Sequence, residues 1–332
     1  MRIVLPDRLV DGTVKQVARD LLDALGSERV SLCFRYITFA EPSATMSVAL
    51  ALRSFRQRRR QAGLDTMVEQ DGLELGHRSN GVSYLAHVGF FRFLGLPYGN
   101  EPGGAPGGAT YVPITVLDDA VLDGQRASPT DLLETVRSRA YALAATASSD
   151  ESARDLLGYC FVETIRNVFE HAGVSECAVM AQRYPSRKEV EIVVADEGRG
   201  VHSSLVESFP ELDEQRALLR CIEPGVTRNL IERGLGKWEN TGFGLFVLSE
   251  LGRRAGVFSI SSSGWALSVS PDGVSIEEQP LPGTVVRIRV DLTDAEFFTN
   301  WLHNIVSTGE RQQAPDTPRK RGASKGLNAG WL

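Results

Sequence analysis

A chain of 332 residues with a net charge of −6, 42% hydrophobic and 23% charged side chains has the composition of a globular protein. The length predicts two domains rather than one core, and the net negative charge makes a nucleic-acid partner unlikely on electrostatic grounds. No apolar run is long enough to span a membrane, and the first residues do not resemble a signal peptide. The four cysteines lack metal-ligand spacing, which predicts reduced, buried thiols in a cytoplasmic protein.

The first hundred residues alternate between strand and helix patterns. Strands are expected over residues 30–36 and 64–70, and helices over residues 42–60 and 84–94. This order predicts a small α/β domain over residues 1–100.

The helix that begins near Pro42 has two features with alternative interpretations. Ser43 or Thr45 would either accept a phosphoryl group or, as is commoner for these residue types, cap the helix N-terminus. The five arginines between Arg53 and Arg60 form either a phosphate-binding patch or, by default, a solvated helix face.

Proline and glycine dominate residues 101–110, which predicts a linker and connecting strand over residues 101–124. A second domain is expected over residues 125–308. Residues 309–332 are polar and basic and predict a disordered tail, in which residues 319–321 are a candidate contact for a partner or nucleic acid.

Residues 160–173 predict a helix with Glu163, Asn167 and His171 at intervals of four. This spacing places an acid, an amide and an imidazole along one face, opposite an apolar stripe that requires a core. The arrangement suits a metal–phosphate site, although a solvated helix face is the ordinary alternative.

A strand over residues 189–195 leads directly into Asp196, with glycines at positions 198 and 200. Gly198 and Gly200 have no Cβ, so the backbone there can approach a flat ligand closely. Asp196 can accept a hydrogen bond from an exocyclic amine, and a simple turn is the alternative reading.

Gly242 and Gly244 open an apolar helical run that starts at Leu245. Free N–H groups and the helix dipole make such a helix start a cradle for phosphate. Further on, Thr284 begins an alternating strand that runs to Val290, and its hydroxyl lies at the strand's first position.

The segment between these glycine motifs, residues 201–241, is interrupted by glycine and proline and predicts a lid. Lys237 and Arg228 are both candidates to reach a terminal phosphate. An amphipathic helix near residues 297–305 would pack on the domain or on a second protomer.

The order of these motifs over residues 125–293 resembles the GHKL ATP-binding family, which includes DNA gyrase, mismatch-repair ATPases, histidine kinases and anti-sigma-factor kinases. The Glu-x-x-x-Asn-x-x-x-His spacing is most similar to the anti-sigma-factor kinases. The resemblance implies a two-layer α/β sandwich of the Bergerat type that binds ATP and Mg²⁺. It also implies signalling by a kinase or ATPase activity.

The same resemblance implies roles for the motif residues. Asn167 would coordinate Mg²⁺, and Glu163 would activate water or a substrate hydroxyl or only orient the metal-bound water. Asp196 would hold the adenine amino group, with Gly198 and Gly200 against the base.

The remaining positions would contact the phosphates or line the adenine pocket. Gly242, Gly244 and Leu245 match the phosphate-cradling motif at the end of the lid, and Thr284 would sit beside Asp196. His171 either belongs to the nucleotide site or caps the end of its helix.

Residues 84–94 are similar to the last helix of STAS domains, the fold of anti-anti-sigma factors. The usual Asp-Ser-Ser/Thr-Gly phosphoacceptor motif is absent, because Glu41, Pro42, Ser43 and Ala44 stand in its place. This similarity implies a degenerate, scaffold-like STAS module. A STAS or sigma-factor-like regulator and a homodimer are the partners it suggests.

Two other functions remain open. A non-catalytic switch would bind ATP and change a partner surface without turnover. A sensor histidine kinase would need a phosphoacceptor on an upstream dimerising helix, for which His77 and His87 are the candidates. Neither is followed by the acid and proline typical of that motif, and residues 130–147 contain no histidine.

Overall fold

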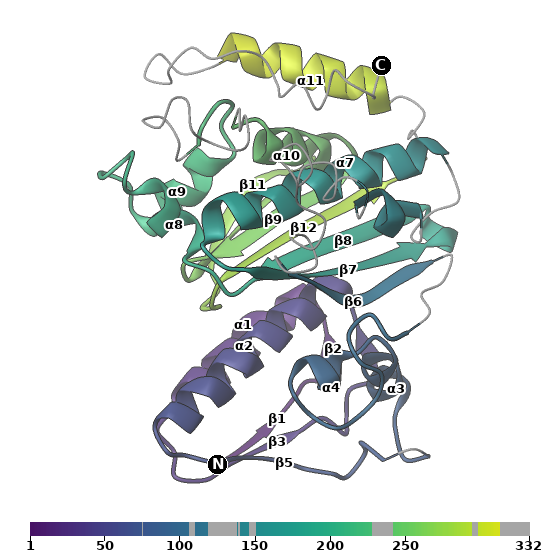
Figure 1. Ribbon diagram of the computed structural model, residues 1–332, viewed down its shortest axis with the longest axis vertical. Helices are drawn as coiled ribbons and strands as arrows, with labels where there is room; N and C mark the ends of the chain where they lie inside the picture. The colour runs from purple at the N-terminus through teal and green to yellow at the C-terminus, as the bar shows by residue number, and fades with distance from the viewer. Residues whose placement is uncertain are drawn as a thin grey trace, which may run out of the picture.

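The computed structural model shows two mixed α/β units stacked on each other (Figure 1). It describes residues 1–74, 76–105, 110–118, 138, 140–145, 151–227, 242–293 and 298–312. Arg228, Lys237 and the tail from residue 313 onward lie outside these ranges. None of the described helices is both long and apolar enough to cross a membrane.

The N-terminal unit contains small parallel sheets and helices. A three-stranded sheet has the order β1 (Arg2–Val4), β3 (Val30–Cys33), β5 (Thr66–Val68), and a two-stranded sheet pairs β2 (Arg8–Leu9) with β4 (Phe39–Ala40). The helices are α1 (Asp11–Asp23), α2 (Pro42–Gln61), α3 (Asn80–His87) and α4 (Phe90–Phe93).

The prediction of one helix over residues 84–94 is wrong. Gly89 has a φ of 88°, a left-handed conformation that ends α3 and redirects the chain into α4. Glycine adopts this conformation without a steric penalty. Gly89 therefore allows two short helices where the apolar pattern suggests one.

Arg59 on α2 is fully buried, so the expected solvated arginine face is wrong at this position. Its guanidinium donates to the carbonyls of Ala24, Leu25 and Ser27 at 2.7–3.2 Å and to that of Asp65 at 2.6 Å. A buried guanidinium needs such partners for its five donors. Arg59 thus ties α2 to the loops around it, and its burial removes it from any phosphate-binding patch.

The C-terminal unit contains a seven-stranded sheet in which all neighbouring strands are antiparallel. Its order is β11 (Gly273–Glu278), β10 (Trp265–Ser270), β9 (Gly256–Ser262), β12 (Thr284–Asp291), β8 (Glu189–Asp196), β7 (Glu176–Tyr184) and β6 (Tyr111–Asp118). A short 3-10 turn, Pro185–Arg187, joins β7 to β8.

Helices cover one face of this sheet (Figure 1). They are α7 (Glu151–Asn167), α8 (Gly200–Leu205), α9 (Glu214–Cys221), α10 (Gly244–Ala255) and the outer α11 (Phe298–Gln312). Leu302 and Ile305 of α11 belong to the same core as α10, so this helix packs on the helical layer. Because α11 runs to Gln312, the predicted disordered tail cannot begin at residue 309.

The opposite face of the sheet packs against α2. Met180, Val193 and Val285 share a core with the N-terminal unit, whereas their neighbours along the strands face α7 and α10. Helices and sheet form two layers, and the N-terminal unit adds a third. The two units are therefore joined through a buried sheet face.

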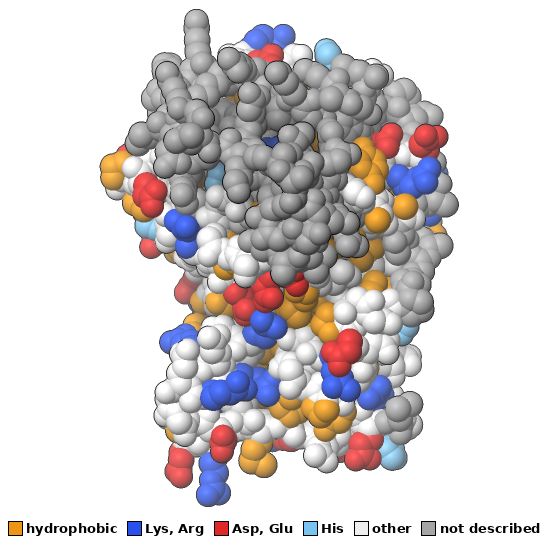
Figure 2. Space-filling model, viewed as in Figure 1, with side chains coloured by type: hydrophobic (Ala, Val, Ile, Leu, Met, Phe, Trp, Pro, Cys, Tyr) orange, Lys and Arg blue, Asp and Glu red, His pale blue; other side chains and the backbone are white. Residues whose placement is uncertain are grey.

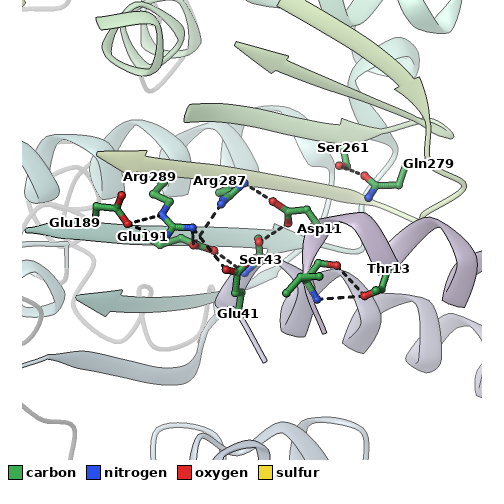
Figure 3. A network of polar contacts seen from close by, with 11 residues as sticks. Asp11, Thr13, Glu41, Ser43, Glu189, Glu191, Ser261, Gln279, Arg287 and Arg289 are labelled. Carbon is green, nitrogen blue, oxygen red and sulfur yellow. Dashed lines mark hydrogen bonds and ion pairs between the residues drawn. The ribbon is translucent and has the colours of Figure 1, made fainter. Parts of the chain in front are cut away.

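A polar network lies within this interface (Figure 3). Glu191 of β8 is fully buried, and its Oε1 accepts a hydrogen bond from the Ser43 amide at 2.9 Å. The carboxylate thus occupies the N-terminus of α2, where the helix dipole favours an anion. Arg287 and Arg289 pair with its other oxygen at 3.5 and 3.7 Å.

The environment of Ser43 and Thr45 bears on both roles suggested for them, phosphoacceptor and N-cap. Ser43 is buried and donates its hydroxyl to Asp11 at 2.6 Å, and Thr45 is fully buried. The N-cap residue is Glu41, so neither hydroxyl caps the helix. Both side chains are buried, and neither is available to accept a phosphoryl group in this structure.

We expect Arg287→Met to destabilise the protein by about 3 kcal/mol, because it removes one partner of a buried charge and leaves Glu191 undercompensated. Denaturant unfolding followed by circular dichroism measures this cost. Arg216→Met is the control, since the ion pair it breaks among the described residues is the exposed one of Arg216 with Asp213. Equal stabilities of the two variants would contradict the role assigned to Arg287.

Candidate functional site

Helix α7 changes from α-helical to π-helical winding at its C-terminal end. After Asn167 it continues as a π-helical turn over Val168–Ala172 and ends at Gly173, whose φ is 72°. Such turns often occur at functional sites because they redirect side chains locally. Asn167 and His171 line a cavity, whereas Glu163 is not among the described residues of its wall.

This cavity lies between α7, the start of α10 and the ends of three strands. It measures about 760 Å³, counting the space open to solvent. Apolar side chains including Val201, Ile260 and Val286 make up much of the wall. The residues of the sequence motifs that line it are Asn167, His171, Asp196, Gly200, Gly242, Gly244, Leu245 and Thr284.

Asp196 ends β8 and is almost fully buried at the cavity wall. It lies opposite Thr284 in the β8–β12 register. Its Oδ1 accepts a hydrogen bond from the Gly198 amide at 2.8 Å. Gly198 therefore supports the carboxylate from the loop, although it is not itself among the residues lining the cavity.

Ser262 extends this polar corner and was not found from the sequence. Its hydroxyl lies 3.2 Å from the Thr284 hydroxyl and accepts a hydrogen bond from the Val201 amide at 3.0 Å. The residue ends β9, directly opposite Thr284 in register. No local pattern marks one serine in the run Ser261–Ser263, so only strand pairing reveals it.

Burial raises the pKa of Asp196 to about 6, since the charged carboxylate loses solvation. The hydrogen bond from Gly198 lowers this pKa, and the nearby charge of Glu197 raises it. Asp196 is mostly ionised at pH 7 and gains a proton in mildly acidic solution. An ionised carboxylate there is a strong acceptor for a ligand amine.

Glu163 lies directly behind the start of α10. A Cβ on Gly244 would lie 2.4 Å from Glu163 Oε2, so any larger residue would have to displace this carboxylate. Glu163 Oε2 also lies 3.3 Å from Arg166 Nη2, and Arg166 Nε lies 3.3 Å from Glu170 Oε1. These three side chains form a buried charged row beside the cavity.

Arg166 and Glu170 were missed in the sequence because they look like the solvated side of a helix. Their only signal is their spacing of three and seven residues from Glu163, which places them on nearly the same face. Arg166 is shared between the two carboxylates, and Glu163 is held in this ion pair rather than on the cavity wall.

Asn167 has an unusual environment. Its Nδ2 is buried and has no hydrogen-bond partner among the described residues. Buried amide donors are normally paired, so an orphan donor beside a cavity indicates a place for a polar ligand. In the described part of the chain, no group of three or more His, Cys, Asp and Glu side chains is arranged to hold a metal ion alone.

In comparisons with known proteins, no protein-family model matches this chain, and no curated protein is significantly similar to it.

We expect Asp196→Asn to stabilise the protein at neutral pH. The unfolded carboxyl has a pKa near 3.9 and the folded one about 6, so wild-type stability falls as pH rises between these values. The variant lacks this cost, and its advantage should grow across that interval to at most about 3 kcal/mol above pH 6. Denaturant unfolding at pH 4, 5, 6 and 7 measures it.

The matched control is Asp291→Asn. Hydrogen bonds from Thr293 lower the pKa of Asp291, so ionisation there favours the folded state. This variant should lose stability relative to wild type as pH rises. Identical pH trends for the two variants would refute the assignment at Asp196.

Gly283→Ala should be more damaging than Gly264→Ala. Both glycines have positive φ, 67° and 86°, so alanine costs about 1 kcal/mol in each backbone. A Cβ on Gly283 would lie 1.9 Å from the Asp196 carbonyl oxygen, whereas no described atom lies within 4 Å of one on Gly264. We expect a further cost of about 1–3 kcal/mol for Gly283→Ala in denaturant unfolding. Equal costs would show that the strands separate freely at Asp196.

Proposed function

We propose that the cavity binds ATP with Mg²⁺, and that the C-terminal unit is a GHKL-type module of the Bergerat fold with kinase or ATPase activity in cytoplasmic signalling. One observation carries this proposal: Asn167, Asp196, Gly200 and Gly244 come from separate segments of the chain and line a single cavity. The order of their motifs resembles that family. The cavity also has a carboxylate acceptor for a base at Asp196 and a helix N-terminus for phosphates at Gly244.

The adenine end of the proposed site is the corner around Asp196. The ionised carboxylate would accept a hydrogen bond from the exocyclic amine, a contact that discriminates sharply against a base lacking that donor. Thr284 and Ser262 lie beside it, and Ile260 and Val286 supply apolar wall for the ring faces.

The phosphate end would lie between Asn167 and the start of α10. Gly242 and Gly244 line the cavity where α10 begins, and the dipole of a helix N-terminus favours phosphate there. The oxygen of the Asn167 amide is a suitable Mg²⁺ ligand, with the remaining ligands coming from phosphates and water. The ion, when bound, would neutralise phosphate charge. Contacts from Lys237 or Arg228 stay predictions.

A non-catalytic switch is the second candidate, and the position of Glu163 favours it. The carboxylate is ion-paired with Arg166 and lies behind Gly244, so it would have to move before it could take a proton from water or a hydroxyl. The histidine-kinase alternative has no such support, since His77 lies in a turn and His87 ends the eight-residue α3.

The N-terminal unit would serve as a STAS-like scaffold for a protein regulator or a second protomer. The Glu191 carboxylate fills the N-terminus of α2, next to Ser43. Because a carboxylate already occupies this helix N-terminus, a scaffold role suits the unit better than a phosphoacceptor role.

Titration calorimetry with ATP, with and without Mg²⁺, tests the site. Wild type should bind ATP more tightly with Mg²⁺, and Asn167→Ala should lose at least about tenfold of that Mg²⁺-dependent affinity. Asn80→Ala, on the exposed start of α3, should behave as wild type. Failure of wild type to bind ATP would end the proposal.

Incubation of Glu163→Gln with γ-labelled ATP separates the two candidate functions. If Glu163 takes part in the chemistry, turnover falls by at least about a hundredfold while ATP affinity is retained. Absence of both phosphate release and protein labelling in wild type would support the switch.

A further inference from the structure

The N-terminal unit reaches the proposed nucleotide site through one arginine. Acidic and basic side chains meet at the junction of the two units (Figure 2). There, Arg53 of α2 forms a two-pronged pair with Glu197, with Nε and Nη2 at 3.1 and 3.0 Å from the two carboxylate oxygens. Glu197 directly follows Asp196, in the segment over residues 196–200 that runs from the end of β8 to the start of α8.

The guanidinium of Arg53 is held from several directions. Its Nη1 donates to the Phe93 carbonyl at 2.9 Å, and its plane lies over the Phe93 ring at 4.5 Å. Nη2 also lies 3.6 Å from Glu176. All three nitrogens therefore have partners, and a lysine could not reproduce this planar, forked arrangement.

The loop over residues 196–200 is anchored at two points. The Arg199 amide donates to the Ala172 carbonyl at 3.0 Å, which ties the loop to the end of the α7 segment. Glu197 ties it to α2 through Arg53. Between these anchors, Gly198 holds the Asp196 carboxylate, and a Cβ there would lie 2.5 Å from Ala172 O.

We propose that Arg53 is a positioning residue that holds this loop, and therefore Asp196, in the orientation that selects an adenine nucleotide. The inference depends on the proposed function, because it assigns base selectivity to a contact made by the other unit. Arg53 does not line the cavity and acts through Glu197. The N-terminal unit thereby becomes part of the specificity of the site.

Charge supports the same conclusion. Arg53 neutralises Glu197, and the charge of Glu197 raises the pKa of Asp196. Within the described ranges, the other titratable groups near Asp196 are Glu176 and Cys177 on β7 and His171 across the cavity. Removing the Arg53 guanidinium, with these other groups left in place, should raise the pKa of Asp196 further. On acidification, ATP binding should then be lost at a higher pH than in wild type.

Arg53→Met tests the proposal, with Arg56→Met as the matched control. Arg56 lies on the same helix and donates to the Leu94 carbonyl, so its loss disturbs α2 without touching the loop. We expect Arg53→Met to weaken ATP binding about tenfold and GTP binding far less, because guanine offers Asp196 no amine at the same ring position. Arg56→Met should keep the wild-type ratio of ATP to GTP affinity.

A double-mutant cycle with Glu197→Gln shows whether the effect passes through that carboxylate. The double variant should bind ATP no more weakly than Arg53→Met alone, and the NMR-measured pKa of Asp196 in the nucleotide-free protein should rise in Arg53→Met but not in Glu197→Gln. Additive losses, or an unchanged ATP-to-GTP ratio in Arg53→Met, would overturn the inference while wild-type ATP binding stands. Absence of ATP binding by wild type would instead refute the proposed function.

Discussion

The register of strand β8 determines how both halves of the molecule are organised. Ile192 and Val194 face the helices α7 and α10, while Val193 and Ala195 face the N-terminal unit. A strand that is apolar on both faces has little preference for either, so hydrophobicity alone sets its register weakly. Glu191 sets the register, since the described partners of its buried carboxylate all lie on the face that α2 covers. A slip of one residue would bury this charge without partners among the helices.

The same register places the candidate site. Because side chains alternate along a strand, Asp196 projects to the face opposite Glu191, the face that carries the cavity. Its ionised form is costly there, which is why its pKa is raised and why the residue works against stability at neutral pH. Such conflicts between local stability and chemistry are typical of functional sites. Gly198 and Gly244 are likewise in close contact with their neighbours, which would have to shift to accommodate a Cβ.

Sequence reasoning predicted the elements whose signals are local. Helix α2, strands β8 and β12 and the helix after Gly244 all appear near their expected residues, because periodicity and glycine placement are properties of a short window. Strands β9–β11 were not predicted, and neither was the burial of both sheet faces. The alternation read over residues 189–195 was correct, but it could not show that the intervening residues face a second core.

The site was predictable in the same partial way. The motif residues can be recognised from the spacing of glycines and acids in the sequence. Ser262, by contrast, is placed beside the site by strand pairing, opposite Thr284. Arg166 and Glu170 have the spacing of an ordinary exposed helix face, and their burial follows from the packing of α10 against α7. Long-range packing, which no window of sequence records, decides these positions.

The two units that the sequence separates near residue 101 are therefore not independent in their packing. The chain changes character near residue 101, yet Met180, Val193 and Val285 of the second unit are buried by the first. Separating the units would expose this apolar face to water and break the hydrogen bond from the Ser43 amide to Glu191. The loop that ends β8 is in turn held by Arg53 from the same helix that covers the strand. The N-terminal unit is thus both the cover of the sheet and a support of the site at the sheet's edge.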